Sequence, residues 1–182
     1  VEKGTITLED ELVAYLPWLT KHRDRRILHV TVLHLLSHTS GLLRDGQDSD
    51  YWLLLRNAPT EKQLIKIILD SSLAFTPGQN VKYSNLGYAL LGLLTETITG
   101  LPFSTYVSRE IIAPLRINSL HAAYSTDISS QIAPAYSSIQ TAKTRSVFAK
   151  RQPLHTFTSA AGSFATPEAM CKYVSVFFTD NT

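Results

Sequence analysis

The strongest constraint on the fold of this chain is an apolar stretch that predicts a buried helix over residues 85–99. The side chains that recur there at helical spacing are mostly apolar: Leu86, Ala89, Leu90, Leu93, Leu94, Thr97 and Ile98. Gly100 and Pro102 follow in the order that is typical of a helix C-terminus. Because a helix this apolar belongs in a protein interior, the other elements are expected to pack around it.

Three polar side chains, Tyr83, Ser84 and Asn85, stand where this helix begins, downstream of a turn signal at Pro77-Gly78. The end of a buried helix is a rigid platform, and rigid platforms position catalytic groups well. The alternative is structural, since Asn is a favoured N-cap and Tyr a common half-buried anchor. The sequence leaves both interpretations open at this point.

The rest of the chain is predicted to be mainly helical. Further helices are expected over residues 7–17, 31–38, 60–72, 103–112 and 166–178. Their starts carry capping signals, such as the box formed by Thr60 and Gln63 and the Pro that follows Thr166. A polar surface loop is expected over 44–50 and a short helix over 51–56, whereas 118–158 predicts no element. The residues expected to face inward on three of these helices are Val32, Leu35, Leu36, Phe103, Tyr106, Val107, Ile111, Met170, Tyr173, Val174 and Phe177.

Composition narrows the class of protein. A chain of 182 residues that is 44% hydrophobic can bury a core and fits one domain or most of one. A net charge of +2, from 17 basic and 15 acidic residues, argues against nucleic acid or an anionic membrane as a partner, and the basic run at 21–26 is interpreted as a solvated loop. Cys171 is the only cysteine, which excludes an intramolecular disulfide and a cysteine metal cage and fits cytosol and periplasm alike. No apolar run reaches the roughly 20 residues of a membrane span.

Several short motifs occur in an order that points to a known family. They are Leu35-Leu-Ser-His-Thr-Ser-Gly-Leu42, Pro77-Gly78, Tyr83-Ser84-Asn85, Ser159-Ala-Ala-Gly162 and Thr166-Pro-Glu168. Together they resemble the serine β-lactamase and penicillin-binding-protein-like family, of the class C type that also includes esterases and D-amino peptidases. The resemblance extends from Val1 to about Phe178.

The resemblance implies a fold and roles for individual residues. The expected fold is the helical lobe of the β-lactamase/transpeptidase-like α/β fold, lacking most of its sheet, with residues 1–182 as one partial domain. Tyr83 inherits an acid/base role and Asn85 a substrate-orienting role in the attack of a serine on an ester, amide or β-lactam carbonyl of a small molecule or peptide. Gly162 is assigned to substrate binding because a small-residue stretch lets backbone approach closely, with a tight turn as the alternative. No metal or organic cofactor is implied.

The departures from the family pattern matter as much. No serine has a lysine three residues later, so the acylating Ser-x-x-Lys is missing, and Lys143-Thr-Arg145 is not Lys-Thr-Gly. We therefore expect an internal piece that is inactive alone, exposes an apolar face, and self-associates or binds hydrophobic dyes. The rival hypothesis is a catalytically dead binding module. Ser84 has no lysine or histidine at an activating spacing, and the pair His34 and His38 is interpreted as structural rather than as a zinc site, because a third ligand is missing.

Overall fold

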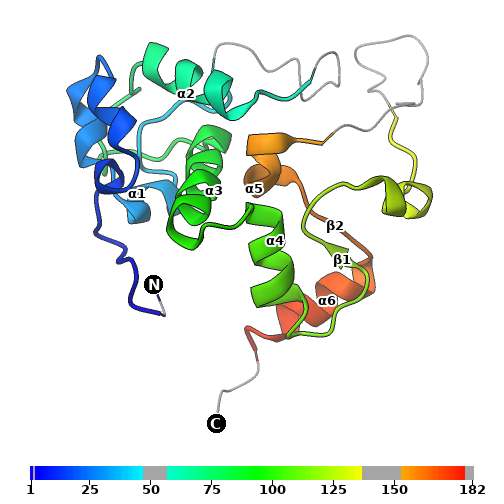
Figure 1. The fold of residues 1–182 in the computed structure, drawn as a ribbon. Helices are drawn as coiled ribbons and strands as arrows, with labels where there is room; N and C mark the ends of the chain where they lie inside the picture. The colour runs from blue at the N-terminus through cyan, green and yellow to red at the C-terminus, as the bar shows by residue number, and fades with distance from the viewer. Residues whose placement is uncertain (2, 47–56, 137–152, 179–182) are drawn as a thin grey trace.

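The computed structural model describes residues 1, 3–46, 57–136 and 153–178, and the architecture is mainly helical around one central helix, α3 (Figure 1). The α-helices are α1 (Val32–Leu36), α2 (Glu61–Asp70), α3 (Asn85–Thr99), α4 (Phe103–Val107), α5 (Thr158–Ala161) and α6 (Pro167–Ser175). The 3₁₀ turns are η1 (Leu12–Ala14), η2 (Pro17–Lys21), η3 (Arg25–His29), η6 (Thr126–Gln131) and η7 (His155–Phe157), and η5 (Ser108–Ile112) is a π-helical turn. Strands β1 (Leu120–His121) and β2 (Phe164–Ala165) pair antiparallel, Leu120 with Ala165 and His121 with Phe164. The predicted helix over 51–56 lies outside the described residues.

Helix α3 confirms the predicted helix at both ends. Ser84 is its N-cap and accepts a hydrogen bond from the Gly87 amide, and Gly100 ends it in the left-handed conformation at φ 68°. Its neighbours are α1, α4, α5 and η7. The first three turns are almost completely buried: Leu86, Ala89, Leu90, Leu93 and Leu94 all belong to the hydrophobic core.

The predicted N-terminal helix is wrong, because residues 7–17 form short 3₁₀ turns held by side-chain bonds within the segment and by a backbone bond to Val30. The Asp10 carboxylate accepts hydrogen bonds from the Thr7 amide and hydroxyl and from the Tyr15 hydroxyl, and these bonds lower the pKa of Asp10. The Leu12 amide donates to the Val30 carbonyl across the chain. Thr7 therefore pairs with a side chain instead of capping an α-helix.

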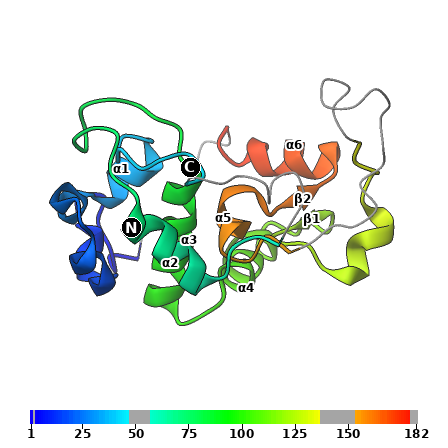
Figure 2. The ribbon, with the colours of Figure 1, turned by 90° about the horizontal axis from the view of Figure 1, so that it is seen from above.

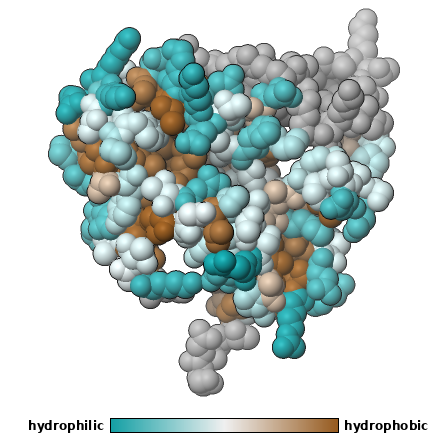
Figure 3. Space-filling view, in the orientation of Figure 1, coloured by the Kyte–Doolittle hydropathy of each residue, from teal (hydrophilic) through white to brown (hydrophobic). Residues whose placement is uncertain are grey.

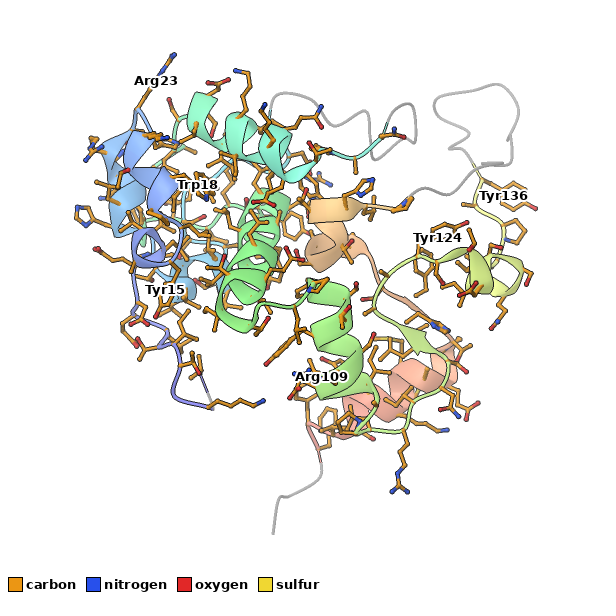
Figure 4. All side chains as sticks on the ribbon, viewed as in Figure 1. Tyr15, Trp18, Arg23, Arg109, Tyr124 and Tyr136 are labelled. Carbon is orange, nitrogen blue, oxygen red and sulfur yellow. The ribbon has the colours of Figure 1, made fainter. Side chains whose placement is uncertain are left out.

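The basic run at 21–26 is also more ordered than a solvated loop. Arg23 does point away from the molecule (Figure 4), but His22 is buried. The Asp24 carboxylate binds the Arg26 guanidinium and the Leu73 amide, while Arg26 donates to the Leu73 carbonyl. This network joins the N-terminal turns to the segment that follows α2.

The starts of α1 and α2 confirm the capping signals. Thr31 and His34 form a capping box at α1, and Thr60 and Gln63 form one at α2. Val32 and Leu35 of α1 are buried as predicted, whereas Leu36, also expected to face inward, is exposed because the helix ends there and the chain turns at His38.

Helix α6 begins as predicted, with the Thr166 hydroxyl accepting from the Ala169 amide. It lies on the side of the molecule away from α1 and α2 (Figures 1 and 2). The inward-facing prediction is wrong for most of its apolar residues, since Met170, Val174 and Phe177 are exposed. On the face of the molecule drawn in Figure 3, apolar side chains lie among polar ones. An open apolar groove of about 410 Å³ runs along α6 between Met170, Cys171, Val174, Ser175 and Phe178.

Among the described residues, no helix by itself has the length and apolarity to cross a membrane. Two consecutive helical segments, Asn85–Thr99 and Phe103–Ile112, have the required length and apolarity only when they are taken together, and the chain bends by 75° between them.

Candidate active site

Tyr83 stands at the surface immediately before α3, with its ring held and its hydroxyl available. The side chain is 54% exposed. Its ring packs on the His38 ring at 4.6 Å between centroids, and the Arg44 guanidinium carbon lies 5.8 Å from the Tyr83 ring centroid. Among the residues that the structure describes, none forms a hydrogen bond with the Tyr83 hydroxyl. A fixed phenol beside a cation is suited to moving a proton.

His38 is the anchor of this arrangement, and the sequence did not assign it that role. Its backbone is left-handed, at φ 58°. Its carbonyl accepts from the Lys82 amide at 2.8 Å, and its Nδ1 accepts from the Ser84 amide at 3.2 Å. The Tyr88 ring also packs against the His38 ring, with 5.0 Å between the two ring centroids. His34, four residues earlier, serves a different purpose, because its Nδ1 accepts from the Thr31 amide in the α1 cap.

Ser84 has a structural role. It is 1% exposed, its Oγ donates to the Leu43 carbonyl at 2.8 Å, and the same atom accepts from the Gly87 amide at 2.9 Å. The N-cap of α3 is therefore Ser84, not Asn85. A hydroxyl that is buried and bonded as both donor and acceptor is a poor nucleophile.

Asn85 is held by a residue that the sequence placed in a polar surface loop. Asn85 is 6% exposed, and its Nδ2 donates to Asp45 Oδ1 at 2.6 Å. Asp45 is itself only 8% exposed and pairs with Arg44, Nε to Oδ2, at 3.2 Å. The surface-loop prediction is thus wrong for Asp45, because its partner lies 40 residues away and no local pattern encodes the contact. The predicted loop beyond residue 46 lies outside the described residues.

Gly162 ends α5 in the geometry of a tight turn. Its amide donates to the Thr158 carbonyl at 2.8 Å, and a Cβ at this position would lie 2.6 Å from Thr158 Cγ2. Helix α5 is tied to α3 by the Ser159 hydroxyl, which donates to the Tyr88 carbonyl at 2.8 Å. No hydrogen bond within the described part of the chain joins Gly162 to Tyr83 or Asn85, and its role in substrate binding remains a prediction.

Metal ligands are not clustered near this site. Across residues 1, 3–46, 57–136 and 153–178, no group of three or more His, Cys, Asp or Glu side chains is placed to hold a metal ion. The side chains gathered around the start of α3 are a phenol, an imidazole, an amide, a guanidinium and a carboxylate.

Comparison with known proteins settles the family. Residues 1–181 match the model of the Beta-lactamase family. The chain belongs to this family. Curated relatives are Protein flp of Staphylococcus aureus (25% identity over 116 residues), penicillin-binding protein 4* of Bacillus subtilis (28% over 125) and N-acetylmuramyl-L-alanine amidase of B. subtilis (29% over 136). These matches cover 64%, 64% and 68% of this chain but only 23%, 25% and 29% of the relatives.

Solved structures of β-lactamase-family members share the fold. A D-stereospecific amidohydrolase from Streptomyces sp. superposes with a TM-score of 0.78 at 26% identity, covering 95% of this chain and 54% of that one. A β-lactamase/D-alanine carboxypeptidase from Pseudomonas syringae superposes with a TM-score of 0.74 at 19% identity, covering 94% and 44%. The chain is thus the helical portion of the β-lactamase/transpeptidase-like fold, and it spans about half the length of these structures.

Proposed function

We propose that this chain supplies the Tyr-x-Asn portion of a serine hydrolase that acts on ester, amide or β-lactam carbonyls through an acyl-serine intermediate. The serine and lysine that start the reaction, and the strand that flanks the site, would come from sequence outside these 182 residues. The chain alone would then be inactive. Support for hydrolysis of such carbonyls comes from the names of the similar proteins given above, which include a β-lactamase/D-alanine carboxypeptidase, an amidohydrolase and an amidase.

The observation that carries the proposal is the contrast between three consecutive residues. Ser84 and Asn85 are buried and hydrogen-bonded to residues 43 and 45 at the start of α3, whereas the Tyr83 ring is exposed between His38 and Arg44 with its hydroxyl free of bonds to the described residues. A tyrosine that served only as a packing anchor would bury its ring and give its hydroxyl a partner.

In the proposed reaction the phenol moves protons. As the serine oxygen bonds to the carbonyl carbon, its proton passes to the Tyr83 oxygen, which the step requires as the phenolate. The same proton is then given to the leaving alkoxide or amine as the bond between that group and the carbonyl carbon breaks. Asn85 offers the amide oxygen that is left after its Nδ2 binds Asp45, and this oxygen can accept a hydrogen bond from an ammonium or a substrate N–H.

We further propose esterase or D,D-peptidase-like activity in preference to a dedicated β-lactamase. Support comes from the D-stereospecific amidohydrolase of Streptomyces sp., which has the higher identity of the two superposed structures.

The test is the variant Tyr83→Phe in the complete encoded protein. Its rate of acylation by an activated ester is measured in a stopped-flow instrument. Loss of the phenolic oxygen is expected to slow acylation about 10²- to 10⁴-fold. Tyr88→Phe is the matched control, because Tyr88 packs on the same His38 ring and its hydroxyl binds only the Leu36 carbonyl among the described residues. Equal rates for Tyr83→Phe and wild type would overturn the assignment.

The absence of Ser-x-x-Lys from these 182 residues supports a second candidate, a binding module of the same fold without catalysis. The two candidates differ in one readily measured property. If the complete encoded protein binds a peptide or β-lactam reversibly but forms no covalent adduct, the binding module is correct.

A further inference from the structure

Three consecutive residues, 43–45, hold the first turn of α3 from one side. The Leu43 carbonyl accepts from the Ser84 hydroxyl, and the Arg44 carbonyl accepts from the Asn85 and Leu86 amides at 2.8 and 3.1 Å. These bonds satisfy amides that a helix N-terminus leaves without intrahelical partners. They also fix the backbone that leads into Asp45 relative to Asn85, so the fold places the carboxylate beside the amide.

The Asp45 carboxylate determines which way the Asn85 amide faces. An amide has a donor end and an acceptor end that are almost equal in shape. A carboxylate oxygen at 2.6 Å can only be faced by the donor end, since two oxygens at that distance would repel each other. Both residues are over nine-tenths buried, so water cannot readily replace either partner. The amide nitrogen is thereby committed to Asp45, and Oδ1 is the acceptor that remains.

We propose that Asp45 is the positioning residue of the Tyr83-x-Asn85 element. Its carboxylate holds the Asn85 amide with Oδ1 as the atom offered to a hydrogen-bond donor of the reaction centre, either the ammonium of the activating lysine or an N–H of the substrate. Its ion pair with Arg44 also fixes the guanidinium near the Tyr83 ring, so one carboxylate orders both functional side chains. This inference rests on the proposed function.

The first experiment measures acylation of the complete encoded protein. Asp45→Ala is expected to slow acylation about 10- to 100-fold, the scale of a misplaced catalytic group, with a smaller change in the concentration of substrate that gives half-maximal rate. Asp45→Asn keeps an oxygen that can still accept from Asn85 Nδ2, and it should recover most of that loss. Arg44→Gln removes the ion pair and the guanidinium beside the Tyr83 ring but leaves the bond between Asp45 and Asn85, and it should be less impaired than Asp45→Ala. Asp70→Asn, on exposed α2 with Lys66 as its partner, is the control for loss of an acidic residue elsewhere.

The second experiment reads the amide without reference to activity. With ¹⁵N-asparagine labelling, and assignment by the signal lost in Asn85→Asp, the Asn85 side-chain protons should exchange slowly in wild type and in Asp45→Asn. They should exchange faster in Asp45→Ala. A wild-type rate of acylation in Asp45→Ala, or unchanged exchange of the Asn85 amide in that variant, would overturn the inference. If wild type itself forms no acyl adduct, the proposed function fails, and the exchange measurement still decides whether Asp45 holds the amide.

Discussion

Helix α3 and helix α6 present apolar side chains to opposite environments. Leu86 and Leu90 of α3 are completely buried beneath α1, α4, α5 and η7. Val174 of α6 and Phe178 just beyond it are 41% and 81% exposed, and the packing of α6 involves chiefly β2. The comparison shows that helical spacing of apolar residues does not by itself bury a helix face, because a second element must also pack against that face. The partners of α3 lie in the described chain, whereas the chain spans only about half the length of the related structures.

The largest expected effect is the difference in stability lost when an apolar side chain is shortened on α3 or on α6. Leu90→Ala removes a fully buried side chain and should lower the free energy of unfolding by about 2–5 kcal/mol. Met170→Ala, on exposed α6, should lower it by less than about 1 kcal/mol. Urea unfolding followed by circular dichroism measures both. Similar losses for the two variants would show that α6 is packed as tightly as α3.

The contact between α3 and α5 gives the next largest effect. A Cβ on Gly92 would clash with Ser159 Oγ and lie 2.9 Å from Ser159 Cβ, so Gly92→Ala strains the contact between the two helices and should destabilise the chain by about 1–3 kcal/mol. Ser159→Gly removes the obstructing atoms. The added methyl should therefore be less harmful in the Ser159→Gly background than in wild type. Equal penalties in both backgrounds would mean that the helices are not in close contact there.

Acid should weaken the link between the N-terminal turns and the segment after α2. The hydrogen bonds from Arg26 are the main cause that lowers the pKa of Asp24 from 3.8 to about 2. Because the folded pKa is depressed, the contribution is fully present above about pH 4 and is lost as the pH falls toward 2. It amounts to about 1–2 kcal/mol once solvent screening of the partly exposed Arg26 is allowed for. The difference in stability between wild type and Asp24→Asn should shrink over this interval, and a constant difference would contradict the account.

The smallest expected effect on stability is that of a substitution at exposed Phe178, which should nevertheless change dye binding and self-association strongly. Phe178→Ser should change the free energy of unfolding by less than about 0.5 kcal/mol, since the ring is exposed. It should nevertheless reduce binding of a hydrophobic dye and self-association, because it opens the apolar groove on α6. Tyr136→Ser, at another exposed aromatic residue, is the control. An unchanged dye signal in Phe178→Ser would show that the apolar groove along α6 is not where the dye binds.

Local signals in the sequence account for what could be predicted. The bounds of α3, the N-cap of α1, the capping box of α2 and the start of α6 all depend on residues within a few positions of each other. What the sequence could not provide depends on distant partners. The bond between Asp45 and Asn85 spans 40 residues and that between Asp24 and Leu73 spans 49, so neither leaves a periodic trace. The same is true of the packing of His38 on Tyr83, although both motifs were recognised separately.

The most direct test of the central claim is covalent labelling followed by intact-mass analysis. The 182-residue chain and a version extended at both ends are incubated with a fluorescent penicillin and an activated fluorophosphonate. The account predicts no adduct on the 182-residue chain and one adduct on the extended protein, because the nucleophile is proposed to lie outside residues 1–182. An adduct on the 182-residue chain would place the nucleophile among its own serines and contradict the roles given to Tyr83 and Asn85.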